Sequence, residues 1–377
     1  MTGETLVSDS SKVTDKMLPD LPPPGNSTGA IGWMSANLFS NMTNTIMTLL
    51  AIYILYILVV PSVNWALLTA DWIGDSRDAC TSGGACWVFI YNRFDQFMYG
   101  FYPEAERWRI DLTFFLLVIQ VAWLVIPKLP RKGLVSAFVL FVYPIIAYYL
   151  LYGGSFGLNL VETHKWGGLS LTLILAIVGI VAALPFGVLL ALGRRSEMPI
   201  VKSFCVVYIE FWRGIPLITV LFMASVMLPL FVPEEVDFDK LLRAMIGIVL
   251  FQSAYMAEVV RGGLQAIPKG QYEAAQALGL NYWKMMGLVV LPQALKMMIP
   301  GIVNTFIALF KDTSLVLIIG LFDLLAIVQA GLSDPDWLGY SVEGYAFVAL
   351  MFWMFCFSMS KYSQHLEKHF HTGHGSR

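Results

Sequence analysis

Long apolar runs dominate the pattern of hydrophobic and polar positions along this chain. A transmembrane helix needs roughly 20 consecutive, mostly apolar residues. Eight runs of about that length occur, over residues 43–67, 111–126, 133–152, 167–192, 214–232, 241–260, 296–312 and 344–362. The seventh run is the least regular, because Pro300 interrupts it and Lys296 and Lys311 flank it. The pattern predicts an all-α polytopic membrane protein with eight spans.

The composition agrees with a protein whose main solvent is lipid. Of 377 residues, 57% are hydrophobic and only 13% are charged, whereas a soluble globular protein carries about 25% charged residues. This argues against a cytosolic enzyme. The net charge of −2 excludes a strongly basic nucleic-acid-binding protein, so membrane lipid is an expected partner and nucleic acid is not.

Two polar tails flank the predicted spans. Residues 1–42 are polar and rich in proline, and they lack the charged and apolar start of a cleavable signal peptide. Within this tail, residues 31–39 suit either a short helix in the membrane interface or an early start of the first span. The second tail, 364–377, is predicted to be solvated.

The histidines of the second tail are the only cluster that resembles a metal site. Four histidines could hold a metal ion, and they stand at His365, His369, His371 and His374. A solvated tail is the simpler explanation, because no carboxylate–histidine arrangement accompanies them. We predict no metal site and no catalytic residue.

The distribution of Lys and Arg predicts the orientation of the chain. Cytoplasmic loops carry an excess of these cations, and the connector 127–132 holds three of them, at Lys128, Arg131 and Lys132. With this connector in the cytoplasm, both termini are cytoplasmic and the loop 69–110 lies outside. Fifteen Lys and Arg then fall inside and seven outside.

Two cysteines lie close together in the loop predicted to be outside. Cys80 and Cys86 are six residues apart, in a compartment where disulfides persist. We expect a small bridged loop. Two free thiols are the alternative, and a zinc pair is less plausible because no second ligand pair is near in sequence.

Residues 261–292 form an unusually long hydrophilic connector between two spans, on the predicted cytoplasmic side. Pro268 leads into a helical segment with Glu273 in its first turns, where a carboxylate is favoured by the helix dipole. Gly279 stops or bends that helix, and Pro292 fits the first turn of the next one. Strong helix propensity with little side-chain bulk comes from Ala274, Ala275 and Ala277.

A helix with a small apolar face and no lipid around it is expected to dock onto another protein, because exposed apolar surface is otherwise costly. The alternative is a helix resting on the bilayer. That role favours Lys or Arg on a polar face with bulky apolar residues opposite, and residues 274–279 lack both.

This segment resembles the EAA loop of ABC importer permeases, in which a coupling helix inserts into an ATP-binding subunit. The matching residues are Glu273, Ala274, Ala275, Gly279, Leu291 and Pro292, with Val289 where the family usually has Ile. The resemblance implies that these six residues couple the chain to an ATPase.

Further stretches are similar to permeases for polar amino acids, the histidine, glutamate, glutamine, arginine and opine group. They are residues 210–217, 254–263 and 306–315, and the resemblance covers 166–362. It implies a type I ABC importer transmembrane domain of five core helices, here with three extra N-terminal spans. Such an extension most resembles the M-type subunit of general L-amino acid importers.

The resemblance also implies a division of the chain. Residues 1–42 are a cytoplasmic tail, and 43–160 are a three-span extension with a periplasmic loop at 69–110. Residues 161–363 are the permease core with its coupling loop at 261–292, and 364–377 are a second cytoplasmic tail. The expected location is the bacterial inner membrane.

No phosphate-binding loop of the Gly-x-x-x-x-Gly-Lys-[Ser/Thr] type occurs in the chain. We therefore expect a transport subunit without an ATPase site or cofactor of its own, with ATP and Mg bound by a partner. The partners that the resemblance implies are an ABC ATP-binding subunit, a homologous Q-type permease in a heterodimer, and a periplasmic amino-acid-binding protein. ATP binding would then drive alternating access and L-amino acid import.

Polar residues within the predicted spans are candidates for the substrate path, because ionisable groups in a bilayer tend to face the bundle interior. They are Gln252, Ser253, Asn304, Thr305, Lys311 and Asp312. Lys311 and Asp312 could bind the two charges of an amino acid, or form an ion pair that anchors the helix end. Two pairs with i,i+3 spacing, Glu258 with Arg261 and Glu210 with Arg213, are expected to be structural.

An ion-coupled secondary amino acid transporter or channel is the alternative from another class. It too would be a polytopic bundle with a few buried polar residues, but we find no clear inverted repeats or broken midplane helices. A structural subunit without a transport path would not need the polar residues of spans six and seven.

Overall fold

The computed structural model describes residues 29–126, 128–231 and 239–370. The chain divides into two units, Met1–Ala70 and Asp71–Arg377, and each is described by itself. Most of the predicted N-terminal tail, the last residue of the predicted span 214–232, and His371 and His374 lie outside the described residues.

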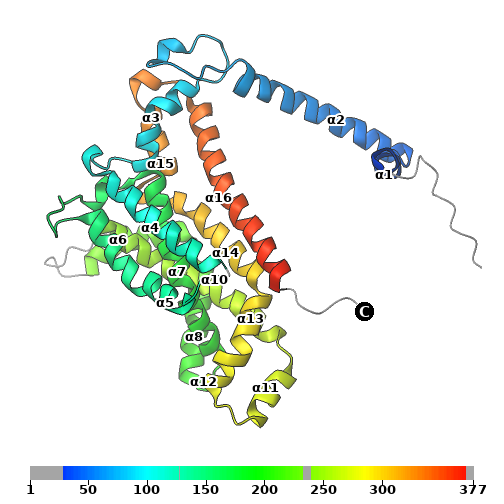
Figure 1. Cartoon of the computed structure of the whole chain (residues 1–377), viewed down its shortest axis with the longest axis vertical. Coiled ribbons are helices and arrows are strands. Elements are labelled where there is room, and N and C mark those ends of the chain that lie inside the picture. Colours follow the sequence, from blue (N-terminus) through cyan, green and yellow to red (C-terminus); the bar gives the residue numbers. More distant parts are fainter. Residues whose placement is uncertain (1–28, 127, 232–238, 371–377) are drawn as a thin grey trace, which may run out of the picture. The chain divides into compact units, whose positions relative to one another are not determined.

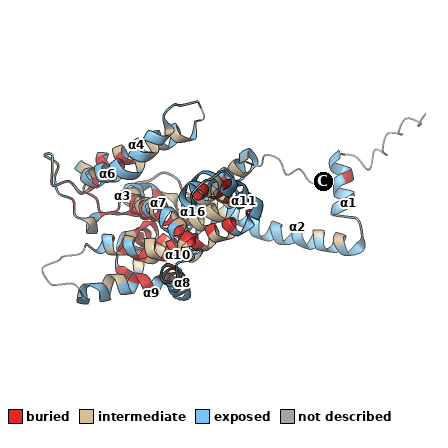
Figure 2. Cartoon of the chain, turned by 90° about the horizontal axis from the view of Figure 1, so that it is seen from below, coloured by how far each residue is buried: buried red, intermediate tan, exposed pale blue. Residues whose placement is uncertain are grey.

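The described part of the first unit is helical. It contains α1 (Gly29–Asn37), α2 (Met42–Val63) and the π-helical turn η1 (Asn64–Leu68). The Asn41 side chain accepts a hydrogen bond from the Asn44 backbone N–H and so caps α2. The segment 31–39 therefore belongs to a separate short helix and is not an early start of the span. No residue of α2 is buried (Figure 2), as expected for a helix that faces lipid.

The second unit is a bundle of apolar helices (Figure 1). Seven helices of the described chain are long and apolar enough to cross a membrane, and a bent helix pair brings the count to eight. One of the seven, Met42–Leu68, belongs to the first unit. The six in the second unit are Glu104–Val125, Lys132–Tyr152, Gly168–Arg194, Lys240–Ala266, Ile299–Ile319 and Ser341–His369. The predicted all-α polytopic fold is confirmed, although the least regular span begins at Ile299 and continues past its predicted end at 312 to Ile319.

These spans are assembled from shorter elements. The first two of the second unit are η3 (Glu104–Glu106) with α4 (Trp108–Val125), and α5 (Lys132–Ala137) with η4 (Phe138–Val142) and α6 (Tyr143–Tyr152). The others are α7 (Gly168–Arg194), α10 (Lys240–Ala266), α14 (Ile299–Asp312) with η9 (Thr313–Ile319), and α16 (Ser341–Phe370). Short connecting elements are η2 (Arg77–Ala79), η5 (Thr163–Lys165), β1 (Phe322–Asp323), α15 (Leu324–Leu332) and η10 (Pro335–Trp337).

The predicted fifth span is the bent pair. Helix α8 (Pro199–Gly214) meets a second helical run, Leu217–Phe231, at an angle of 101°. That run consists of α9 (Leu217–Phe222), η6 (Met223–Met227) and η7 (Leu228–Phe231). Pro216 disfavours the helical conformation at Ile215, which is extended with ψ 146°. Residues 193–213, which separate two predicted spans on the predicted cytoplasmic side, thus belong largely to a 16-residue helix.

The loop 69–110 is also more structured than a connector. It contains α3 (Trp87–Tyr99), which packs against α7, α15 and α16. One face of α3 is buried in an apolar cluster with residues of α15 and α16, through Val88, Phe89, Ile90 and Phe97. This amphipathic helix therefore belongs to the packed core of the second unit.

Helices α7 and α10 pack closely at the centre of the bundle. A Cβ atom added to Gly187 of α7 would lie 2.6 Å from the Met256 Cβ on α10, so only glycine fits at this crossing. Small residues at helix interfaces allow such close backbone approach in membranes. In Figure 2, α10 carries many buried positions.

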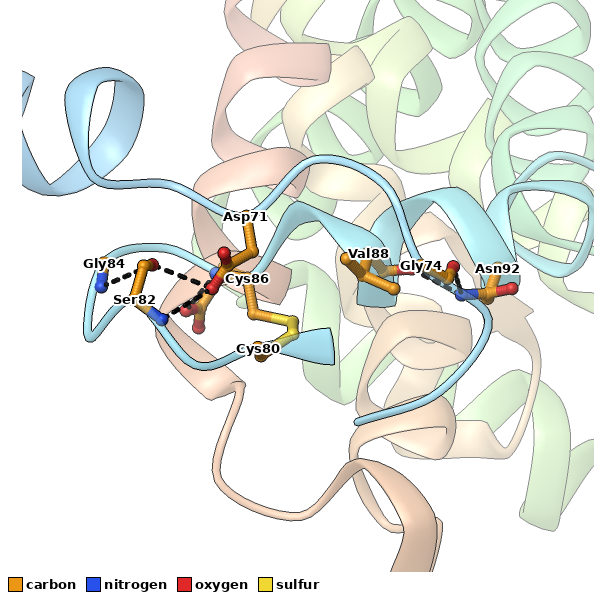
Figure 3. The surroundings of a disulfide bond; sticks show 9 residues. Asp71, Gly74, Cys80, Ser82, Gly84, Cys86, Val88 and Asn92 are labelled. Carbon is orange, nitrogen blue, oxygen red and sulfur yellow. Dashed lines mark hydrogen bonds between the residues drawn. A yellow bond between two sulfur atoms is a disulfide. The ribbon is translucent and has the colours of Figure 1, made fainter. Parts of the chain in front are cut away.

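A disulfide joins Cys80 to Cys86 and closes a small loop before α3 (Figure 3). The Asp71 carboxylate accepts hydrogen bonds from the Ser82 backbone N–H at 3.1 Å and the Ser82 hydroxyl at 2.8 Å. These bonds lower the pKa of Asp71. The Cys86 backbone N–H donates to Glu343 on α16 at 3.1 Å, so the loop is attached to the end of that helix.

Candidate coupling loop and translocation path

The coupling-loop residues lie in two helical segments at one end of the second unit. The first is α11 (Lys269–Ala277), and the second runs through α12 (Tyr282–Met285), η8 (Met286–Val290) and α13 (Leu291–Met297). In Figure 1 these elements are at the opposite end of the unit from α3 and α15.

Helix α11 begins directly after Pro268. Glu273 is its fifth residue and no acidic residue lies in the first turn, so the expected gain from the helix dipole has largely decayed at that position. The Glu273 side chain is exposed. Its carboxylate is thus available to a partner and not committed to capping.

Gly279 ends α11 as predicted, because its φ of +72° is strained for residues with a side chain. The Gly279 N–H donates to the Gln276 carbonyl at 2.9 Å, and the Leu280 N–H donates to the Ala275 carbonyl at 3.2 Å. These two bonds form a Schellman motif, which satisfies carbonyls at the helix end. The turn directs the chain sharply into α12.

The two faces of α11 have different surroundings. Ala275 is 3% exposed and belongs to a buried cluster that includes Met286 and Val290, so it holds α11 against its own chain. The remaining small face is exposed, at Ala274, Ala277 and Gly279. On the same loop, Leu278 and Trp283 are 80% and 70% exposed, so the loop has apolar surface that this chain leaves uncovered.

Pro292 lies in the first turn of α13 (Leu291–Met297), as predicted. The helical run begins at Tyr282, where the Asn281 side chain caps it by accepting from the Lys284 N–H at 3.0 Å. Pro292 lies ten residues into this run, just after the π-helical turn η8, and next to the half-buried Leu291. A wider π turn accommodates the missing N–H and the ring of proline.

The polar candidates on α10 are committed to contacts between helices. The Gln252 side-chain amide donates to the Thr305 carbonyl on α14 at 2.9 Å. The Ser253 hydroxyl donates to the Leu250 carbonyl at 2.8 Å and lies 2.9 Å from the Tyr208 hydroxyl on α8. Both side chains are at most 3% exposed. These bonds hold α10 against its neighbours in this structure.

The candidates on α14 are more accessible. Asn304, Ala308 and Lys311 are exposed, and their spacing places them on one face of the helix. The Thr305 hydroxyl donates to the Gly301 carbonyl at 2.8 Å. Asp312 is half-buried, and no ion pair within 4 Å joins it to Lys311 among the described residues. The alternative of a helix-anchoring ion pair is therefore not formed.

Charged residues at the end of α7 connect three helices. The predicted pair Glu258–Arg261 is confirmed, at 2.7 Å. The pair Glu210–Arg213 is not formed, because Glu210 binds Arg194 at 3.0 Å and Arg213 faces Glu258 at 3.8 Å. Glu210 on α8 and Glu258 on α10 both bind Arg194 on α7. Spacing along a single helix could not predict this contact between helices.

The sequence analysis did not identify two polar side chains that the structure places in specific contacts. Tyr272 on α11 binds Arg195, and the only sequence signal is an Arg-Arg pair directly after an apolar run. Asp323 is fully buried at the start of α15, where it accepts from the Leu325 and Ala326 N–H groups. Burial raises the pKa of Asp323 to about 6 despite these bonds.

Comparisons with known proteins give the family. Residues 183–372 match the family described as "Binding-protein-dependent transport system inner membrane component". The "Inner membrane amino-acid ABC transporter permease protein YhdY" of Escherichia coli (strain K12) is 59% identical over 94% of this chain and 97% of its own length.

Two further relatives differ in how much of the chain they match. The "Glutamate/glutamine/aspartate/asparagine transport system permease protein BztC" of Rhodobacter capsulatus is 41% identical over 98% of this chain and 100% of its own length. The "Probable glutamine ABC transporter permease protein GlnP" of Bacillus subtilis (strain 168) is 32% identical over 54% of this chain and 91% of its own length.

These matches confirm the family that the EAA-loop pattern predicted, and family membership argues against an ion-coupled secondary transporter. The chain belongs to the binding-protein-dependent transport system inner membrane components, as a multi-pass permease subunit of an ABC transporter and not its ATPase.

Proposed function

We propose that this chain is one of two permease subunits that import L-amino acids across the inner membrane by alternating access. The names of YhdY and BztC support amino acids as the cargo, and the name of BztC includes glutamate, glutamine, aspartate and asparagine. The second subunit is a homologous Q-type permease, which makes this chain the M-type partner of a heterodimer.

The coupling role rests on one observation above all, the uncovered apolar surface of the α11–α12 turn. Leu278 and Trp283 are largely exposed on the same loop as the small face of α11, and exposed apolar side chains of this kind favour a protein partner. An ATP-binding subunit with a groove for this turn is that partner. It binds ATP and Mg, and the residues that meet it are Glu273, Ala274 and Gly279.

Ala275, Leu291 and Pro292 contribute to coupling in a different way. Ala275 is buried and Leu291 is half-buried, so they fix the coupling helix to the permease. ATP binding shifts the equilibrium between inward-facing and outward-facing states only by its different affinity for the two. A rigidly mounted α11 transmits that difference, with a coupling of about 1–3 kcal/mol.

The substrate path runs along the exposed face of α14. Lys311 binds the carboxylate of the amino acid and Asp312 its ammonium group, while Asn304 supplies a neutral hydrogen-bonding side chain. Thr305, Gln252 and Ser253 hold α10 and α14 in place through the bonds described above. The other wall of the path comes from the partner permease.

The proposed orientation places both termini and the coupling loop in the cytoplasm. The coupling loop and the disulfide-bridged loop lie at opposite ends of the second unit (Figure 1), which suits one loop on each side of a membrane. A periplasmic amino-acid-binding protein delivers its cargo on the side of the disulfide.

The experiment is copurification followed by reconstitution. A tagged chain extracted from native membranes should bring down an ABC ATPase and a second permease. In proteoliposomes, uptake of L-glutamine should require ATP and the binding protein. A chain that purifies alone, and takes up L-glutamine with an ion gradient and no ATP, would overturn the proposal.

A further inference from the structure

Two consecutive arginines at the end of α7 contact different parts of the protein. Arg194 donates to Glu258 on α10 at 2.7 Å and to Glu210 on α8 at 3.0 Å. Arg195 donates to the Leu264 carbonyl of α10 at 2.9 Å. The same Arg195 nitrogen, Nη1, donates to the Tyr272 hydroxyl at 3.1 Å. The Arg194–Arg195 corner therefore touches α8, α10 and the coupling helix α11.

Glu258 is the carboxylate that the arginines around Arg194 share. One of its oxygens accepts from Arg194, and the other accepts from Arg261 Nε at 3.0 Å and Nη2 at 2.7 Å. Arg213 Nη1 lies 3.8 Å from the same oxygen. The Glu258 side chain is only 16% exposed, so this carboxylate holds arginines from three helices where water competes weakly.

Tyr272 is the residue of α11 that contacts Arg195. Its hydroxyl accepts from Arg195 and donates to the Leu264 carbonyl at 3.2 Å. Its ring lies 5.7 Å from the Arg195 guanidinium carbon, within the range of a cation–π contact. Among the described residues, Tyr272 is the only side chain of α11 that is hydrogen-bonded to α7 or α10.

We propose that Tyr272 and the Arg194–Arg195 corner form the joint through which movement of α11 is transmitted to the transmembrane helices. This inference rests on the proposed coupling function of α11. Arg195 and Tyr272 fix α11 to the ends of α7 and α10, and Arg194 and Glu258 make those ends and α8 move as one body. Tyr272 is thus a positioning residue, which contacts neither cargo nor ATP.

The test is Tyr272→Phe in the copurified complex, reconstituted with its binding protein and assayed with L-glutamine. The substitution keeps the ring in the apolar cluster and removes only the hydroxyl and its two hydrogen bonds. We expect the ATP hydrolysed per L-glutamine imported to rise about fivefold or more, with complex yield and basal ATPase unchanged. A protein that is merely less stable would lose both activities in proportion and keep this ratio.

The matched control is Tyr362→Phe on α16, outside the coupling loop, because the Tyr362 hydroxyl makes no hydrogen bond among the described residues. Its ratio should equal that of the wild type. Arg195→Gln should act like Tyr272→Phe, and the double variant should be no worse than either single one, because all three remove the same contact. The proposal would be overturned if the effects of the two substitutions on the ATP hydrolysed per L-glutamine were additive. It would also be overturned if Tyr272→Phe had the wild-type ratio.

The Gly279→Asp variant separates the joint from the coupling function itself. If Gly279→Asp raises the ratio and Tyr272→Phe does not, α11 couples transport but the joint is refuted. If neither variant changes the ratio in an ATP-dependent complex, the proposed role of α11 fails, and the joint fails with it.

Discussion

The side-chain amide of Gln252 donates a 2.9 Å hydrogen bond to the main-chain carbonyl of Thr305 and thereby ties α10 to α14. The Gln252 side chain is almost fully buried. A buried amide with this partner is a structural element of the bundle, and its loss leaves the Thr305 carbonyl with one bond fewer. Gln252 is therefore expected to contribute to the stability of the bundle and not to the binding of cargo.

Gln252→Ala should lower stability and leave substrate affinity unchanged. The expected loss in unfolding free energy is about 1–3 kcal/mol, for the lost bond and the cavity. Thermal unfolding in detergent measures the first effect, and the KM for L-glutamine measures the second. A large rise in KM without a change in Tm would place Gln252 in the substrate path.

Lys311→Met should have the opposite signature. Lys311 is exposed on α14, so its removal should leave Tm within about 1 °C of the wild type, as for most surface substitutions. Uptake of L-glutamine should fall at least about tenfold, because a bound carboxylate would lose a charged partner. Lys165→Met, at another exposed lysine, is the control and should transport normally; equal uptake by both variants would refute the role of Lys311.

Gly279→Asp should uncouple uptake from ATP hydrolysis without preventing insertion. The substitution puts a charge on the proposed docking surface and a side chain at a φ of +72°, which costs about 1 kcal/mol in local strain. L-glutamine uptake in proteoliposomes should fall about tenfold while ATPase activity persists. Gly279→Asn is the matched control, since Asn tolerates the same backbone conformation without the charge. If both variants fail equally, backbone strain and not docking explains the defect.

Asp323 should make stability depend on pH. Burial raises the pKa of Asp323 from 3.8 to about 6, so the folded state holds this proton more tightly than the unfolded state does. Its contribution to stability is therefore greatest below pH 4, declines as the pH rises towards 6, and is constant above that. The change amounts to about 3 kcal/mol.

The measurement is unfolding of the detergent-solubilised protein at pH 4 and pH 7. Asp323→Asn keeps an oxygen for the backbone N–H groups of α15 and should remove this part of the pH dependence. Asp336→Asn, at an exposed position, should leave the dependence as it is. An unchanged pH profile in Asp323→Asn would show that this carboxyl titrates normally.

Removing the disulfide should destabilise the second unit moderately. The Cys80–Cys86 bridge closes a short loop, and the entropy of closing such a loop corresponds to about 2 kcal/mol. The double variant Cys80→Ser/Cys86→Ser should show this loss in thermal unfolding, and it should no longer respond to a reductant. Cys356→Ser changes a cysteine that is free and should unfold as the wild type does.

Elements that depend on a local pattern of residues were predictable without the structure. Apolar runs predicted the transmembrane helices, because a span is recorded in consecutive residues. The end of α11 was predictable for the same reason: Gly279 ends this helix in a left-handed conformation, and that signal is carried by single positions. The spacing of Cys80 and Cys86 likewise indicated a small closed loop.

Which face of each helix contacts which neighbour became known from the tertiary structure alone. It buried Ala275 within the permease, gave Gln252 a carbonyl on α14 as its partner, and paired Arg195 with Tyr272, 77 residues away in sequence. It also buried Asp323. Such contacts depend on how helices distant in sequence pack together, and neither hydropathy nor the spacing of residues along one helix encodes that arrangement.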